Sequence, residues 1–294
     1  MKKLLLISFV LTVVSCFVSC GSDSDDEKGT KPKYGGTCCI NGIYYNLNNN
    51  DKTAAVIKSP RDKYDGGDVV IPSSINNNGV EYVVNRIEKE AFMSCIYLTS
   101  IVIPNSVTSI GRNAFTNCER LTSITIPESV VKIDRDVFSD YLKKITINSN
   151  TLVSKDYKGV FLIDCFTNQS IEEVILGDKV TRIGDYAFDL FKKLTTIYIP
   201  NSVTSIGERA FSFCWYMKSV TIPESVTSIG NGAFECCDEL TNVYCYAEQV
   251  PEAGTDMLDW FTYEKATLHV PATSIDAYKN ANQWKRFSRI VAIE

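Results

Sequence analysis

One pattern of apolar and polar positions recurs through most of this chain. Residues 98–111 read LTSIVIPNSVTSIG, and close copies begin at residues 121, 194 and 217. In each copy, β-branched residues alternate between two faces before a proline, which has no amide proton to donate to a neighbouring strand. The pattern therefore predicts one short strand in each copy, ending at the proline.

The copies are regularly spaced. The residues that end the predicted strands are Ile103, Ile126, Ile147, Leu176, Ile199, Ile222 and Cys245, in steps of 23, 21, 29, 23, 23 and 23. An incomplete first copy surrounds residues 69–72. Repeats of this length indicate a solenoid, in which each unit buries its apolar face only against its neighbours. We expect roughly eight strands stacked as a parallel sheet, about 4.8 Å apart.

The rest of each unit predicts a second extended piece and a compact turn. The VTSIG segment closes on a glycine, and the following residues, as in 207–214, have the three-residue spacing of a helical turn. A phenylalanine recurs in this turn at positions 92, 115, 138, 188, 211 and 234, and we expect these rings to form a buried stack. The unit over 142–170 is longer and has Asn148 in place of the proline, so we expect an outward loop around residues 155–169.

The full unit, LTSITIPxSVTSIGxxAFxxC, resembles the BspA-like leucine-rich repeat family of bacterial surface proteins over about residues 69–250. Residues 41–47 and 67–72 are similar to that family's N-terminal cap, and residues 266–290 are similar to its C-terminal cap of a strand, a short helix and a last strand. The resemblance implies a β-rich solenoid, namely a leucine-rich-repeat horseshoe of parallel strands and short helical turns that is capped at both ends. It also implies adhesion to host matrix proteins or to other bacteria.

The N-terminal residues predict export. Lys2 and Lys3 precede an apolar run over residues 4–18, which is too short for a comfortable membrane span and is typical of a signal peptide. The run ends in FVSCGS, which resembles a bacterial lipobox with Cys20 as the lipidated residue; Cys16 and an ordinary signal peptide are the alternatives. The acidic stretch that follows resembles the surface-export signal of some Gram-negative anaerobes. We expect a protein that is exported and lipid-anchored to the outer membrane at the cell surface.

These features divide the chain into five parts. They are a lipoprotein signal peptide over 1–19, an acidic flexible tether over 20–33, an N-terminal cap over 34–68, leucine-rich repeats of about 23 residues over 69–250 and a C-terminal cap over 251–294. The tether has no apolar side chain to bury between residues 21 and 30. The caps are expected to cover the open ends of the stack.

Composition excludes several classes of function. The formal charge of −5 argues against nucleic acid as a partner and against docking on anionic lipid through a basic face. The single histidine, His269, excludes metal sites built from several histidines. A Cys–His catalytic pair would need this same residue, which lies in a strand-like segment of the cap. The chain also lacks a phosphate-binding glycine loop and a serine nucleophile elbow.

The carboxylates offer no distinct acid and base. Asp134, Asp136, Glu172 and Glu173 are expected on the solvated side of the units, where nothing desolvates one carboxylate relative to another. We therefore expect no catalytic residues, no metal and no cofactor.

Eleven cysteines in an exported chain would normally suggest a disulfide framework. Four of them, Cys95, Cys118, Cys214 and Cys237, each lie three residues after the phenylalanine of their unit. Other units have Tyr141 and Phe191 at that place, so the position is an apolar slot and we expect packed thiols there. Cys38 or Cys39, in the N-terminal cap, is the candidate for any disulfide.

The outward side chains of the strands form the candidate binding surface. Between the two inward positions of successive strands lie Val102, Thr125, Thr146, Ile175, Tyr198, Thr221 and Tyr244. We expect this strand side to be concave and expect Tyr198 and Tyr244 to flank a recess over Thr221, with Ile175 beside them. Tyrosine offers a flat apolar body and a hydroxyl at low entropy cost, although Thr and Tyr are also ordinary strand formers.

The sequence thus favours a non-catalytic surface protein that binds host extracellular matrix or other cell-surface proteins. The alternatives are a glycan-binding accessory lipoprotein, which would need exposed paired aromatics, and a hydrolase, which would need two carboxylates about 5–10 Å apart in a cleft. Trp215, Trp260 and Trp284 are expected to be packing residues.

Overall fold

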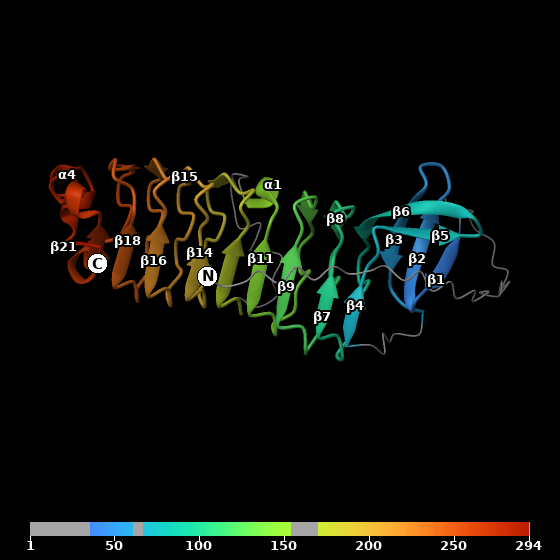
Figure 1. The fold of residues 1–294 in the computed structure, drawn as a ribbon. Helices are drawn as coiled ribbons and strands as arrows, with labels where there is room; N and C mark the ends of the chain where they lie inside the picture. The colour runs from blue at the N-terminus through green and yellow to red at the C-terminus, as the bar shows by residue number, and fades with distance from the viewer. Residues whose placement is uncertain (1–35, 61–66, 154–169, 294) are drawn as a thin grey trace, which may run out of the picture.

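The structure, a computed structural model, describes residues 36–60, 67–153 and 170–293. The predicted signal peptide, Cys20, the tether and the predicted loop at 155–169 lie outside the described residues. The described part is an elongated rod with the N-terminal cap at one end and the C-terminal cap at the other (Figure 1).

Short parallel strands form one long side of the rod. They are β4 (Asp68–Val70), β7 (Ser100–Val102), β9 (Ser123–Ile126), β11 (Lys144–Ile147), β12 (Glu173–Leu176), β14 (Thr196–Tyr198), β16 (Ser219–Ile222) and β18 (Asn242–Cys245). Side chains alternate between buried and outward positions, as the sequence pattern predicts. The longer unit does not interrupt this side, because β11 pairs in register with both β9 and β12. The predicted solenoid of stacked parallel strands is confirmed.

Two-residue strands form a second ladder. They are β8 (Ser109–Ile110), β10 (Lys132–Ile133), β13 (Arg182–Ile183), β15 (Ser205–Ile206), β17 (Ser228–Ile229) and β19 (Glu252–Ala253). The glycine after each serine–isoleucine pair is required by close backbone approach: a Cβ on Gly230 would lie 2.4 Å from the Glu208 nitrogen. In the longer unit, α1 (Asn150–Val153) takes the place of this strand, and the Val153 carbonyl accepts a hydrogen bond from the Gly184 amide at 2.8 Å.

The turns that close each unit contain the predicted three-residue spacing but no continuous helix: within one turn, the Met93 amide donates to the Glu90 carbonyl at 3.0 Å and the Cys95 amide to the Phe92 carbonyl at 3.1 Å. Most of these turns also place two residues in the left-handed region four positions apart, such as Glu90 (φ 60°) and Ser94 (φ 61°). Alternate amides then point along the rod, and the Phe92 amide donates to the Ala114 carbonyl of the next unit at 2.8 Å. Hydrogen bonds between units therefore alternate with hydrogen bonds inside the turn, and together they satisfy this backbone.

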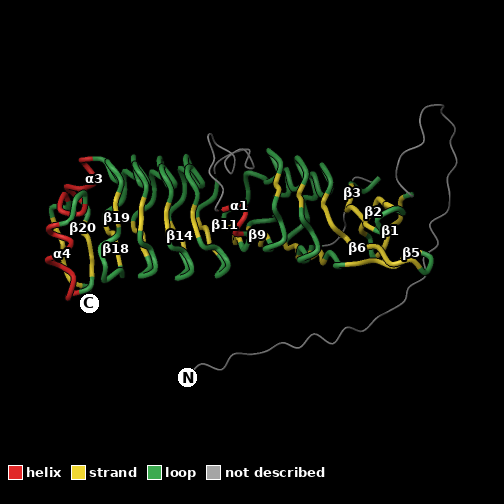
Figure 2. The backbone as a smooth tube through the Cα atoms, turned by 90° about the horizontal axis from the view of Figure 1, so that it is seen from above, coloured by secondary structure: helices red, strands yellow, loops and turns green. Residues whose placement is uncertain are grey.

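The phenylalanines of the turns form the predicted stack. Phe211 lies between Phe188 and Phe234, with ring centroids 5.4 and 5.3 Å apart and planes within 9° of parallel. This spacing is close to the roughly 4.8 Å between neighbouring strands. The rod is close to straight in both views (Figures 1 and 2). The leucine-rich-repeat solenoid that the sequence predicts is present, and its described part shows little of the expected horseshoe curvature in these views.

The repeat cysteines pack beside this stack, as expected. Cys118, Cys214 and Cys237 are buried thiols whose Sγ atoms donate to the carbonyls of Phe92, Phe188 and Phe211 at 3.1, 3.4 and 3.3 Å. Burial raises the pKa of the Cys118 thiol to about 12 and raises those of Cys214 and Cys237 as well. Cys95 is also buried. These thiols act as small apolar side chains in the core.

The N-terminal cap continues the second ladder. Its strands are β1 (Thr37–Ile40), β2 (Ile43–Asn48), β3 (Thr53–Ile57), β5 (Ser74–Asn77) and β6 (Val80–Ile87). One sheet runs in the order β1-β2-β3-β6-β8-β10, so the cap covers the first repeat without a break. Cys38 and Cys39 lie in β1; Cys38 is buried and Cys39 is a free thiol.

The C-terminal cap has the predicted strand, helix and strand. It contains α3 (Trp260–Lys265), β20 (Thr267–Val270), the 3-10 turns η1 (Ala272–Ser274) and η2 (Trp284–Arg286), α4 (Ile275–Asn280) and β21 (Arg289–Ala292). β20 pairs with β18 and β21 pairs with β20, all parallel, so the strand side of the rod extends into the cap.

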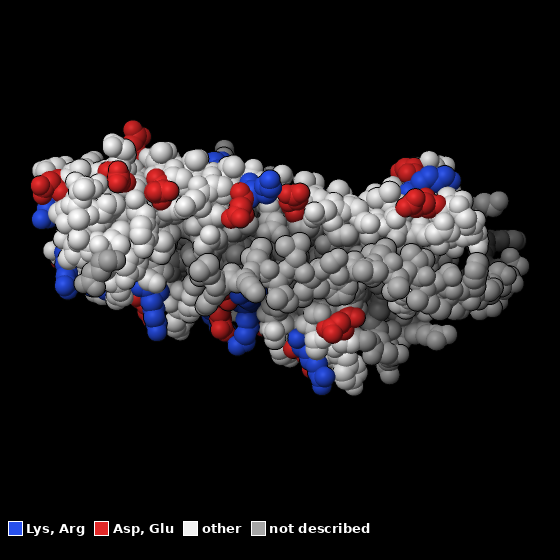
Figure 3. Space-filling model, in the orientation of Figure 1, with Lys and Arg blue, Asp and Glu red and all other residues white. Residues whose placement is uncertain are grey.

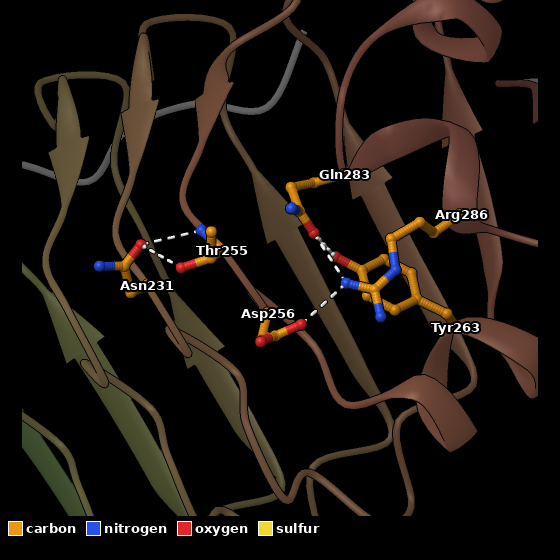
Figure 4. Close-up of polar contacts among 6 residues, drawn as sticks. All are labelled: Asn231, Thr255, Asp256, Tyr263, Gln283 and Arg286. Atoms are coloured by element: carbon orange, nitrogen blue, oxygen red, sulfur yellow. Dashed lines mark hydrogen bonds and ion pairs between the residues drawn. The ribbon is translucent and has the colours of Figure 1, made fainter.

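Polar contacts join this cap to the last repeat and hold it together: the Thr255 amide donates to Oδ1 of Asn231 at 2.8 Å (Figure 4). The Arg286 guanidinium donates to Asp256 at 3.0 Å and to Gln283 at 2.9 Å, and it lies 4.4 Å from the centroid of the Tyr263 ring. Trp284, fully buried as predicted, donates through Nε1 to the Pro251 carbonyl at 2.8 Å.

Candidate binding face

The outward side chains of the parallel strands form one column along the rod, here called the strand face. It consists of Val70, Val102, Thr125, Thr146, Ile175, Tyr198, Thr221, Tyr244, His269 and Val291. Register places Ile175 opposite Tyr198, and Thr221 opposite Tyr244. The four predicted binding residues therefore follow one another on consecutive strands β12, β14, β16 and β18. Their role in binding stays a prediction.

The two tyrosines differ in their surroundings. Tyr198 is 54% exposed, whereas Tyr244 is half-buried because its ring stacks on His269 with centroids 4.3 Å apart and planes within 20°. Nε2 of His269 lies 3.0 Å from Oδ1 of Asn242 and completes this cluster. The sequence analysis placed His269 correctly in a cap strand. It did not predict the stack, because the stack depends on which cap strand pairs with β18.

Polar and charged side chains lie at the start of the strands that form this face. Lys144 pairs with Glu173 at 2.8 Å and Lys143 with Glu172 at 3.1 Å. At the N-terminal end, hydrogen bonds from Ser100 and Thr99 lower the pKa of the Asp68 carboxyl. These contacts join neighbouring units and leave the charges at the surface.

The carboxylates considered for catalysis all lie in ion pairs. Glu172 and Glu173 pair with lysines as above, Asp134 lies 3.3 Å from Lys132, and Asp136 lies 2.9 Å from Arg112. Each pair is partly exposed, so these carboxylates share one kind of surrounding. Unequal surroundings are what separate a general acid from a general base, and this arrangement does not supply them.

The edge of the strand face where the strands begin carries exposed aromatics that sequence reasoning missed. Tyr97, Tyr141 and Tyr216, each directly before the residue that starts the next repeat pattern, are 52%, 48% and 49% exposed. The prediction that Tyr141 fills the buried slot of the repeat cysteines was therefore wrong, because its unit is two residues shorter and Tyr141 falls at this exposed position. Trp215, at 37% exposed, is beside Tyr216, so its prediction as a packing residue was wrong, as was that for Trp260, which is 67% exposed on α3. The sequence does contain a signal for this exposed edge, because the residues at these positions vary between units. Residues 96–97 read IY, 119–120 read ER and 192–193 read KK.

Charged side chains gather along the two long edges of the strand face where that face is visible (Figure 3). The acids Glu128, Asp178, Glu224 and Glu248 follow the ends of the strands, whereas Lys143, Lys193 and Lys218 precede their starts. Among the described residues, no group of three His, Cys, Asp or Glu side chains could hold a metal ion. Nor does any helix in that part of the chain have the length and apolar character to cross a membrane.

Solved structures of bacterial leucine-rich repeat proteins are similar to this chain. A leucine-rich cell surface protein of Faecalibacterium prausnitzii is 30% identical with a TM-score of 0.44, and the match covers 74% of this chain and 56% of that one. A leucine-rich repeat protein of Bacteroides ovatus is 20% identical with a TM-score of 0.41, and the match covers 87% of this chain and 76% of that one. The pneumococcal vaccine antigen PcpA is 16% identical, with coverages of 89% and 99% and a TM-score of 0.35. The chain thus spans little more than half of the first of these proteins.

No curated protein matches the chain. A family match is extensive, however: residues 72–162 and 163–283 match the BspA type leucine-rich repeat region, in six copies. The match covers most of the chain, including both the repeats and much of the C-terminal cap. The chain therefore belongs to the BspA-type leucine-rich repeat family.

Proposed function

We propose that this protein is a non-catalytic binding protein of the bacterial cell surface, anchored through lipid on Cys20, that uses its strand face to hold proteins of the host matrix or of other cells. The observation that carries the proposal is Tyr198. A tyrosine that is 54% exposed in the middle of a regular sheet contributes little to folding. Exposed aromatics of this kind are typical of binding surfaces.

The strand face suits a rigid binding mode. β12 and β16 lie on either side of β14, and β9, β11, β12, β14, β16 and β18 follow one another in one row (Figure 1). A surface that is already ordered loses little conformational entropy when a partner docks. Many modest contacts along the row, with a few aromatic anchors, then supply the affinity.

Ring orientation favours a protein over a glycan as partner. Tyr244 and His269 stack across neighbouring strands, so each ring covers one face of the other. A sugar that stacks on an aromatic needs an exposed ring face. Ring edges and hydroxyls suit hydrogen bonds and packing with a polypeptide. The glycan-binding accessory protein stays the second candidate through Tyr198, whose neighbours in the column are Ile175 and Thr221.

Binding to immobilised matrix proteins and to a glycan array tests the proposal. With the partner found, Tyr198→Ala should weaken binding by about 1–2 kcal/mol, which is roughly 5- to 30-fold, without lowering the melting temperature appreciably. Arg135→Ala, an exposed residue on the turn side, is the matched control and should bind normally. A loss with Arg135→Ala and none with Tyr198→Ala would show that the turns are the working surface.

A further inference from the structure

Three lysines and two aromatics gather where β14 and β16 begin. We call Lys192, Lys193, Trp215, Tyr216 and Lys218 the Lys–Trp patch. Lys193 and Lys218 are exposed, and Lys192 Nζ lies 4.7 Å from the centroid of the Trp215 ring. Within the described residues, no ion pair involves any of these three lysines. The patch is a local exception in a chain whose formal charge is −5.

The repeat does not require these side chains. The same positions read Ile96-Tyr97, Glu119-Arg120, Asp140-Tyr141 and Asp238-Glu239 in other units. Contacts that hold the units together at this edge come from backbone carbonyls: Lys192 accepts from the Tyr216 amide at 3.3 Å, and Lys218 accepts from the Thr241 amide at 3.0 Å. The packing of the repeat therefore does not depend on the positive charges of Lys193 and Lys218.

The neighbouring charges limit what the patch can hold. On the side toward the N-terminus, Lys143 and Lys144 are already paired with Glu172 and Glu173. On the other side, the next unit presents the exposed Asp238 and Glu239. A long polyanion that ran along this edge would meet these two acids, whereas a short acidic segment would end before them.

We infer that the Lys–Trp patch binds a short acidic segment of a partner protein. Carboxylates of the segment accept charge-assisted hydrogen bonds from Lys193 and Lys218, and an apolar side chain of the segment packs on Trp215 and Tyr216. Tyr198 lies on the same unit as Lys192 and Lys193, so the segment continues onto the strand face. The inference rests on the proposed function, and it gives that function a chemistry for the partner.

Selection from a random twelve-residue peptide library tests this, with the full chain in detergent as the bait. Recovered peptides should be enriched in Asp and Glu. Their affinity for the double variant Lys193→Glu/Lys218→Glu should be at least tenfold lower than their affinity for the parent protein. Lys179→Glu, an exposed lysine at the opposite edge of the same face, makes a matched charge change and should bind as the parent does. Raising the salt concentration should weaken the parent's binding.

The outcomes separate the inference from the proposed function. Peptides that lack acidic enrichment but lose binding with Tyr198→Ala would overturn the acidic partner and leave the strand face as the binding surface. Peptides that bind Tyr198→Ala and Lys193→Glu/Lys218→Glu as well as they bind the parent would overturn both the acidic partner and the strand face as the binding surface. A heparin oligosaccharide that outcompetes acidic peptides at the patch would show a glycan site and overturn the inference.

Discussion

Truncation of one ring in the phenylalanine stack tests how the rod is held together. Phe211 is fully buried, and its ring lies between two parallel rings at 5.4 and 5.3 Å. Its backbone hydrogen bonds, including the one from its amide to the Ala233 carbonyl at 2.8 Å, do not depend on the side chain. Phe211→Ala therefore removes the ring alone.

The expected cost follows from that burial. Removal of a buried phenylalanine side chain costs about 3–5 kcal/mol, because apolar burial is lost and a cavity remains. Phe211 stacks on both faces, which favours the upper half of this range. With an m value of about 3 kcal/mol/M in urea, a loss of about 4 kcal/mol lowers the unfolding midpoint by about 1.3 M. Urea unfolding followed by circular dichroism measures this shift.

The control must be a side chain without a structural contact. Glu208, in the same unit, was expected to be solvated, but it is half-buried and accepts a hydrogen bond from the Tyr186 hydroxyl at 3.1 Å. Glu224, exposed after β16, is the cleaner choice, and Glu224→Ala should shift the midpoint very little. Equal shifts for Phe211→Ala and Glu224→Ala would refute the assignment of the stack as the core of the rod.

Three further predictions follow from the export signal, the thiols and the glycines. Cys20→Ala should abolish labelling by radioactive palmitate in cells; label that persists would place the lipid elsewhere. Cys118, whose pKa rises to about 12, contributes stability that is fully present below its ordinary pKa near 9.0, so the free energy of unfolding should fall between these pH values; the fall should be smaller in a Cys118→Ala variant, in which the raised pKa values of Cys214 and Cys237 still contribute. Gly230→Ala should lower the melting temperature by several degrees, since the new Cβ would lie 2.4 Å from the Glu208 nitrogen; an unchanged value would contradict the close backbone approach.

The strand positions could be predicted from the sequence because they depend on a local period. A strand that alternates buried and exposed side chains has the same pattern in every unit, and the proline marks its end. Ile124 and Val220, for example, are buried in the middle of their strands, as the repeat predicts. The 23-residue step then dictates that equivalent residues lie side by side, which is why the column containing Tyr198 and Thr221 was foreseen.

The turns and the curvature were decided by contacts between units. Left-handed residues such as Arg209 (φ 49°) and Phe213 (φ 57°) are not glycines, so nothing in the local sequence indicates this conformation. It is stabilised by hydrogen bonds such as that from the Phe213 amide to the Glu235 carbonyl at 2.8 Å in the next unit. The straight rod follows from these bonds, because they hold the turn side nearly as tightly as the strand side.

The sequence by itself determined which side chains point outward from the strand face, since that depends only on the alternation along each strand. Which of them touch one another was decided by the tertiary structure. The Tyr244–His269 stack exists because the cap adds β20 beside β18. The exposed Trp215 and the lysines around it, which form no ion pair among the described residues, are apparent only when neighbouring units are placed side by side. Charge pairing and burial depend on neighbours in space and not on neighbours in sequence.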